Sequence, residues 1–174
     1  MKKKIFIACD TTDLIKVRKI MAQSQTNKIK IGYKFGLEFM NSKNGRRFIS
    51  KLKSKIIFVD LKLNDTVHTM LSTVRALKDL KINYLTVHIS SGLTALKAVK
   101  KVSRSIKIVG VSTLTSLNDE DLRLIGYSRS IKNLVAHQAK LAKRAALDAL
   151  VCSPFEVNIV RKIFKKEIIT PGVQ

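Results

Sequence analysis

Residues 56–65 read Ile-Ile-Phe-Val-Asp-Leu-Lys-Leu-Asn-Asp, and this stretch decides the fold. Its four leading apolar residues are typical of a short strand buried on both faces, as in parallel sheets. Asp60, Lys62 and Asp65 then follow in a D-x-K-x-x-D pattern. Asp60 and Lys62 are two residues apart, so on a regular strand both should point to the same side. Ligands and chemistry in α/β folds lie at this carboxyl end, so the pattern predicts a functional site. The alternative is an ion pair that only solvates the rim of the sheet.

The same alternation of apolar runs and amphipathic segments recurs along the chain. We predict strands over residues 4–9, 28–33, 55–60, 83–88, 106–111, 148–152 and 167–170. Between them we predict helices over 13–22, 44–52, 65–80, 92–101, 119–125, 130–144 and 154–164. Repeated β–α units with right-handed crossovers give a parallel sheet.

The ends of many different predicted strands carry polar residues, which favours a (β/α)8 barrel of the TIM type over an open sheet. These residues are Asp10, Lys30, Asp60, His88 and Thr115. A complete barrel usually needs roughly 250 residues. We therefore expect a single, incomplete barrel domain over residues 1–174, with about seven parallel strands and without the last helix and strand.

Composition indicates a globular protein, because 45% of the residues are hydrophobic and only 7 are Gly and 2 Pro. No apolar run approaches the roughly 18 residues of a membrane span, so no membrane association is predicted. Cys9 and Cys152 lie in apolar segments without a C-x-x-C pattern, which predicts two free thiols in a reducing cytoplasm.

The net charge of +22, from 34 Lys and Arg against 12 Asp and Glu, would permit binding to nucleic acid. The basic residues are nevertheless spread along the chain, and no helix-turn-helix, RNA-recognition or zinc-finger pattern is present. We interpret the charge as a Lys-rich solvated surface and do not predict nucleic acid as a partner. A positive field would also steer an anionic, phosphate-bearing substrate.

Several motifs, in the same order along essentially the whole chain, resemble those of the orotidine 5′-phosphate decarboxylase family. They are Ala8-Cys9-Asp10, Lys30-Ile31-Gly32, Asp60 to Asp65 followed by Thr69, Val87-His88, Val111 to Ser116, Val151 to Pro154, and Thr170-Pro171-Gly172. The resemblance implies a TIM-type barrel that converts orotidine 5′-phosphate to uridine 5′-phosphate and carbon dioxide in pyrimidine synthesis. It also implies that the nucleotide is decarboxylated without a metal or another cofactor.

The resemblance further implies roles for individual residues. Lys30, Asp60, Lys62 and Asp65 would form a charged catalytic group, in which Asp60 also contacts the substrate. Asp10 and Lys30 would contact the ribose hydroxyls. Asp65 and Thr69 would reach the site of the other subunit in a homodimer with shared active sites. Either Thr115 or Ser116 would meet the pyrimidine ring.

The proposed chemistry suits these residue types. Loss of carbon dioxide leaves a carbanion on the ring, and no cofactor is there to delocalise it. The site must therefore stabilise negative charge and deliver a proton. The ammonium group of Lys62 can do both.

The chain also departs from the family pattern. Gln174 stands where the family has an Arg after Thr-Pro-Gly, and the last helix, the last strand and their Gly-Arg phosphate motif are not in the sequence. Because remote phosphate contacts help to reach the transition state, we expect weak activity from this chain alone. Two alternatives stay open: a Mg²⁺-dependent sugar-phosphate decarboxylase of the same superfamily, and a catalytically inactive truncated barrel that acts as a basic binding module.

Overall fold

The computed structural model describes residues 4–52 and 55–172, in which strands and helices alternate. The strands are β1 (Lys4–Ala8), β2 (Lys30–Gly36), β3 (Ile56–Leu63), β4 (Tyr84–His88), β5 (Lys107–Val111), β6 (Ala149–Val151) and β7 (Glu167–Ile169). The α-helices are α1 (Leu14–Gln23), α2 (Leu37–Asn41), α3 (Gly45–Ser50), α4 (Val67–Ala76), α5 (Leu93–Val102), α6 (Asp119–Leu124), α7 (Ile131–Arg144) and α8 (Val157–Ile163). Three 3₁₀ turns are η1 (Lys78–Leu80), η2 (Ile89–Ser91) and η3 (Pro154–Glu156).

The strands follow one another in the sheet in the order of the sequence, from β1 to β7. Strands β1, β2 and β3 pair in parallel, and so do β5, β6 and β7. Parallel neighbours joined by helices are what the alternating sequence pattern predicted. Their carboxyl ends meet at the same edge, where a barrel enzyme carries its chemistry.

The chain divides into two compact units. The first comprises Met1–Leu61 with Arg75–Leu85, and the second comprises Lys62–Val74 with Thr86–Gln174. Each unit has its own buried residues and is described by itself.

In the first unit, aromatic rings pack between β1, β3 and β4. The ring of Phe6 lies 4.9 Å from that of Phe58 and 5.0 Å from that of Tyr84, both edge to face. Lys4 lies over the Tyr84 ring and donates to its hydroxyl. A Cβ atom at Gly32 would approach Phe6 to 2.7 Å, so β2 needs a glycine there for close packing.

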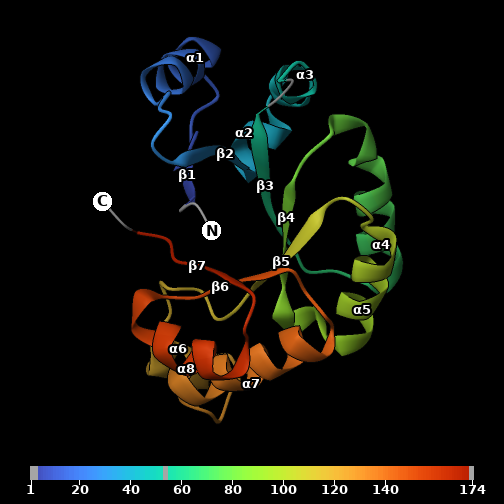
Figure 1. Cartoon of the computed structure of the whole chain (residues 1–174). Coiled ribbons are helices and arrows are strands. Elements are labelled where there is room, and N and C mark those ends of the chain that lie inside the picture. The colour runs from blue at the N-terminus through green and yellow to red at the C-terminus, as the bar shows by residue number, and fades with distance from the viewer. Residues whose placement is uncertain (1–3, 53–54, 173–174) are drawn as a thin grey trace. The chain divides into compact units, whose positions relative to one another are not determined.

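In the second unit, α7 and α8 lie side by side below β6 and β7 (Figure 1). Helix α7 begins after Ser130 and buries one apolar stripe. Its buried apolar residues are Leu134, Val135, Ala139 and Ala142. The pairing of β5 with β6 runs from Val109 opposite Ala149 to Val111 opposite Val151.

Most predicted helices are present, and two of them begin with a side-chain cap in the structure. Asp13 caps α1 by accepting hydrogen bonds from Ile15 and Lys16. Asn118 caps α6 in a full capping box with Asp121.

Several predicted boundaries were wrong, and one helix was missed. The strand predicted over 55–60 is β3 (Ile56–Leu63), which ends three residues later. The predicted strand over 28–33 is in fact Lys30–Gly36, so β2 ends three residues later. Helix α2 was not predicted; it is held by Phe39, whose ring lies 4.7 Å from that of Phe35 and 5.7 Å from that of Phe48. The predicted helix over 65–80 is α4 followed by η1, because α4 ends at Ala76.

Candidate active site

The first unit brings together three charged residues from β2, β3 and the residues after β1. The Nζ atom of Lys34 lies 3.5 Å from Oδ1 of Asp10 and 3.5 Å from Oδ2 of Asp60. The side chain of Asp60 is 11% exposed and that of Asp10 is 61% exposed. In the register of the sheet Ala8 lies opposite Lys34, and Gly36 lies opposite Asp60. A lysine is thus held between two carboxylates at the carboxyl ends of three neighbouring strands.

The structure does not place Lys30 in this group. Lys30 is the first residue of β2, lies opposite Lys4 at the amino end of β1, and is exposed. Lys34, which the sequence analysis missed, takes the place expected for Lys30 beside Asp60.

The sequence contains two Lys-x-Gly motifs, and only the structure tells them apart. In Lys30-Ile31-Gly32 the glycine is required by the ring of Phe6, 2.7 Å from where a Cβ would lie. In Lys34-Phe35-Gly36 the nearest atom to such a Cβ is Oδ1 of Asp10, at 3.7 Å. The second motif therefore faces the charged group, whereas the first serves packing.

Lys62 belongs to the second unit and has an unusual backbone. Its φ angle is +48°, in the left-handed region, although it lies inside β3. Such a conformation costs a non-glycine residue on the order of 1–3 kcal/mol and is concentrated at functional sites. The N–H of Lys62 donates to Oγ1 of Thr86 on β4 at 2.8 Å. The simple alternation of side chains that the sequence analysis assumed between Asp60 and Lys62 does not apply at a left-handed residue.

Asp65 and Thr69 lie on either side of the start of α4, and both are exposed. Oδ1 of Asp65 accepts from the N–H of Thr66 at 2.6 Å. The hydroxyls of Thr66 and Thr69 lie 3.1 Å apart. These local contacts fix how the chain passes from the D-x-K-x-x-D pattern into α4.

Thr115 and Ser116 are both exposed in the segment after β5. The start of that segment is held by Gln138 of α7, which is only 6% exposed. Oε1 of Gln138 accepts from the N–H of Thr113 at 2.8 Å and from its hydroxyl at 3.2 Å. Sequence reasoning missed Gln138, because a glutamine on a helix carries no motif; the choice between Thr115 and Ser116 stays open.

Both cysteines are buried thiols, as predicted. Burial, with a smaller contribution from Asp10, raises the pKa of Cys9 from 9.0 to about 11. Burial, followed by Glu156, raises the pKa of Cys152 from 9.0 to about 11. Neither thiol is activated as a nucleophile.

A groove of about 370 Å³ lies along α7, lined by Arg129, Asn133, Ala136, His137 and Lys140. None of these residues belongs to the predicted site. Within residues 4–52 and 55–172, no group of three or more His, Cys, Asp or Glu side chains is placed to hold a metal ion. In the same part of the chain, no helix is both long and apolar enough to cross a membrane.

The sequential parallel strands and the charged residues at their carboxyl ends define the class: an enzyme built as a β/α barrel. The sequence profile of the orotidine 5′-phosphate decarboxylase / HUMPS family matches residues 3–174. The chain belongs to this family.

Named relatives and a solved structure agree with this assignment. The orotidine 5′-phosphate decarboxylase of Wolbachia pipientis subsp. Culex pipiens (strain wPip) is 39% identical over 177 residues, which cover 98% of this chain and 76% of the relative. The enzyme of the same name from Prochlorococcus marinus (strain MIT 9215) is 35% identical over 185 residues, with 98% and 75% covered. The crystal structure of orotidine 5′-phosphate decarboxylase from Lactobacillus acidophilus matches with a TM-score of 0.87 at 28% identity, over 99% of this chain and 82% of that one. The predicted fold class is confirmed.

Proposed function

We propose that this protein is a carboxy-lyase that converts orotidine 5′-phosphate to uridine 5′-phosphate and carbon dioxide, a step of pyrimidine biosynthesis. One observation carries the proposal. In a chain of this family, Lys34 lies 3.5 Å from a carboxylate oxygen of both Asp10 and Asp60, and Asp60 opens the D-x-K-x-x-D pattern of β3.

The reaction needs one bond to break and one to form. The bond between the ring carbon and the carboxylate carbon breaks, carbon dioxide leaves, and the electron pair stays on the ring carbon. We assign the proton that this carbon then takes to the ammonium group of Lys62, which regains a proton from water. A fixed cation both stabilises the developing charge and shortens the proton transfer.

The carboxylates have a different task in this proposal. Asp60 is buried, so its charge next to the substrate carboxylate would raise the energy of the bound substrate more than that of the transition state. Lys34 pairs with Asp60 at 3.5 Å and holds its carboxylate in place. We assign Asp10 and Lys34 to the ribose hydroxyls, since together they offer an acceptor and a donor.

The remaining roles rest on the family motif. We assign Asp65 and Thr69 to the site of the partner subunit in a homodimer, and Thr115 or Ser116 to the pyrimidine ring. A single domain over 1–174 and a location in the cytoplasm, the latter inferred from two unpaired thiols, stay predictions.

The test is a decarboxylation assay on the purified chain with orotidine 5′-phosphate, followed by ultraviolet absorbance and by release of carbon dioxide. We expect turnover that Lys62→Ala lowers by about 10²–10³ and that EDTA leaves unchanged. Absence of turnover would overturn the proposal. Turnover of a sugar phosphate that stops on addition of EDTA would instead identify the Mg²⁺-dependent alternative.

A further inference from the structure

The backbone of Lys62 differs from that of the other residues with positive φ. Four non-glycine residues among those described have a positive φ: Lys62, Lys81, Arg104 and Ala146. Lys81 ends η1, Arg104 follows the last residues of α5, and Ala146 follows the end of α7. Left-handed residues are ordinary where a helix terminates. Lys62 has no helix to terminate, so its conformation needs another cause.

That cause is found on the neighbouring strand. The N–H of Lys62 donates to Oγ1 of Thr86 at 2.8 Å, across 24 positions of sequence and within the second unit. Thr86 is 1% exposed, so its hydroxyl is shielded from water. Because threonine is branched at Cβ, its χ1 angle has few options in a strand, and the oxygen is held in one position.

We propose that Thr86 is a positioning residue for Lys62. Its hydroxyl accepts the Lys62 N–H and thereby holds the left-handed turn of the backbone. In that conformation the Cα–Cβ bond of Lys62 leaves the strand in a direction that a regular strand residue would not have. Thr86 thus sets where the ammonium group lies, while touching no reacting atom. This inference rests on the proposed function, in which Lys62 delivers the proton.

The substitution that isolates the hydroxyl is Thr86→Val. Valine has the shape of threonine and lacks only the oxygen, so the N–H of Lys62 loses this acceptor while the packing volume is kept. Thr86→Ser keeps the oxygen and loses a methyl group. The matched control is Val87→Ala, because Val87 is the next residue of β4, is 0% exposed, and carries no hydroxyl.

The first measurement is steady-state kinetics with orotidine 5′-phosphate. We expect Thr86→Val to lower kcat at least tenfold with KM changed less than threefold, because substrate binding is kept and proton delivery is not. Thr86→Ser should recover kcat to within threefold of the wild type. Val87→Ala should lower the melting temperature and leave kcat within threefold. Equal losses of kcat in Thr86→Val and Val87→Ala would show a general effect of core damage and overturn the proposal.

The second measurement does not depend on activity. Hydrogen exchange of the Lys62 amide, followed by NMR, should be at least tenfold faster in Thr86→Val than in the wild type and in Thr86→Ser. If Thr86→Val does not fold, Thr86→Ala serves in its place. An unchanged exchange rate would overturn the role of Thr86. If the wild type does not decarboxylate at all, the proposed function fails, and this exchange comparison alone decides whether Thr86 holds Lys62.

Discussion

The Nζ atom of Lys34 lies 3.5 Å from Oδ2 of Asp60, and the two side chains are 25% and 11% exposed. A carboxylate with so little access to water is stabilised by a nearby cation, and removing one member of such a pair is costly. Lys34 also lies 3.5 Å from Asp10, so one lysine serves two carboxylates. This arrangement makes Lys34, rather than Lys30, the lysine of β2 on which the proposed reaction depends.

Replacing Lys34 by alanine should therefore disable the enzyme. We expect kcat/KM to fall at least a hundredfold, equivalent to about 2.7 kcal/mol, because Asp60 loses the ion pair with Lys34 and the ribose loses a proposed donor. Lys30→Ala is the matched control, since it removes the same side chain from the other end of the same strand, where Lys30 is exposed. The kcat/KM of Lys30→Ala should stay within twofold of the wild-type value. A large loss of kcat/KM in Lys30→Ala with little loss in Lys34→Ala would show that Lys30 is the functional lysine.

Lys62→Ala should remove the proton donor. We expect turnover to fall by about 10²–10³, or roughly 3–4 kcal/mol, the scale of losing a main electrostatic group. Lys81→Ala is a suitable control, because Lys81 is also a lysine with positive φ, at +50°, but it is exposed at the end of η1. Turnover by Lys62→Ala above about a tenth of the wild-type value would contradict its assignment.

The sequence predicted the strands and the charged end of β3 because these depend on local patterns. An apolar run followed by D-x-K-x-x-D can be recognised in the sequence without knowledge of any neighbouring strand. The choice between Lys30 and Lys34 was not readable, because it depends on where β2 stops relative to β1 and β3. Lys30 and Lys34 are four residues apart, so both belong to the same face of β2. Lys30 lies at the amino end of the strand, whereas Lys34 lies toward its carboxyl end.

The conformation of Lys62 could not be predicted for a different reason. A left-handed lysine inside a strand has no sequence signature. Its partner Thr86 lies 24 residues away, in a strand whose pattern is that of an ordinary buried segment. The same holds for Gln138, whose contact with Thr113 joins α7 to the residues after β5. Side-chain contacts between distant elements are set by tertiary structure alone.

The proposed sharing of active sites between two subunits makes a specific prediction for mixed subunits. A Lys62→Ala subunit and an Asp65→Ala subunit should each be inactive alone. If Asp65 completes the partner's site, one site in the mixed dimer has both residues intact, and activity should reappear after the subunits exchange. In an equal mixture about half of the dimers are mixed, and one of the two sites in each mixed dimer is intact. The recovered activity should therefore approach a quarter of that of the same amount of wild-type protein. No recovery after confirmed exchange would mean that each site is self-contained.

The two thiols should be unreactive while the protein is folded. Raising a thiol pKa from 9.0 to about 11 lowers the thiolate fraction at pH 8 by about a hundredfold. We therefore expect iodoacetamide to alkylate Cys9 and Cys152 at least that much more slowly in the native than in the urea-unfolded chain. The neutral thiols also favour folding, fully below pH 9 and progressively less as the pH rises toward 11. Rapid alkylation of either cysteine in the native protein would contradict its burial.

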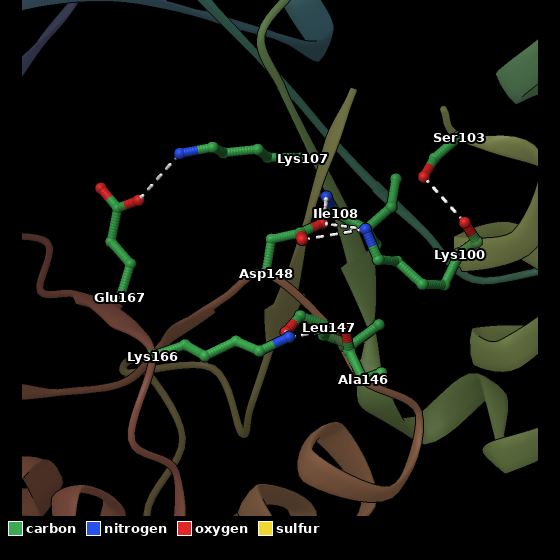
Figure 2. A network of polar contacts seen from close by, with 9 residues as sticks. All are labelled: Lys100, Ser103, Lys107, Ile108, Ala146, Leu147, Asp148, Lys166 and Glu167. Atoms are coloured by element: carbon green, nitrogen blue, oxygen red, sulfur yellow. Dashed lines mark hydrogen bonds and ion pairs between the residues drawn. The ribbon is translucent and has the colours of Figure 1, made fainter. Parts of the chain in front are cut away.

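The polar network around Asp148 should matter for stability and not for catalysis. Lys100 donates to both carboxylate oxygens of Asp148, at 2.8 and 2.7 Å, and the N–H of Ile108 donates to Oδ2 at 2.8 Å (Figure 2). Asp148 also donates its own N–H to the carbonyl of Ile108. Ile108 and Asp148 lie at the amino ends of β5 and β6, the edge of a β/α barrel that serves stability.

Asp148→Ala should destabilise the protein by about 2–3 kcal/mol, because one substitution removes three hydrogen bonds to a charged group. The melting temperature should fall by roughly 4–12 °C in a chain of this size, with kcat within twofold of the wild type below that temperature. The matched control is Asp79→Ala, which breaks the ion pair with Arg46 at 2.6 Å, where the two side chains are 46% and 63% exposed. An exposed pair contributes at most about 1 kcal/mol, so this variant should melt within roughly 4 °C of the wild type. Equal melting temperatures for the two variants, or a loss of kcat in Asp148→Ala at a temperature where it is folded, would contradict a purely stabilising role for this network.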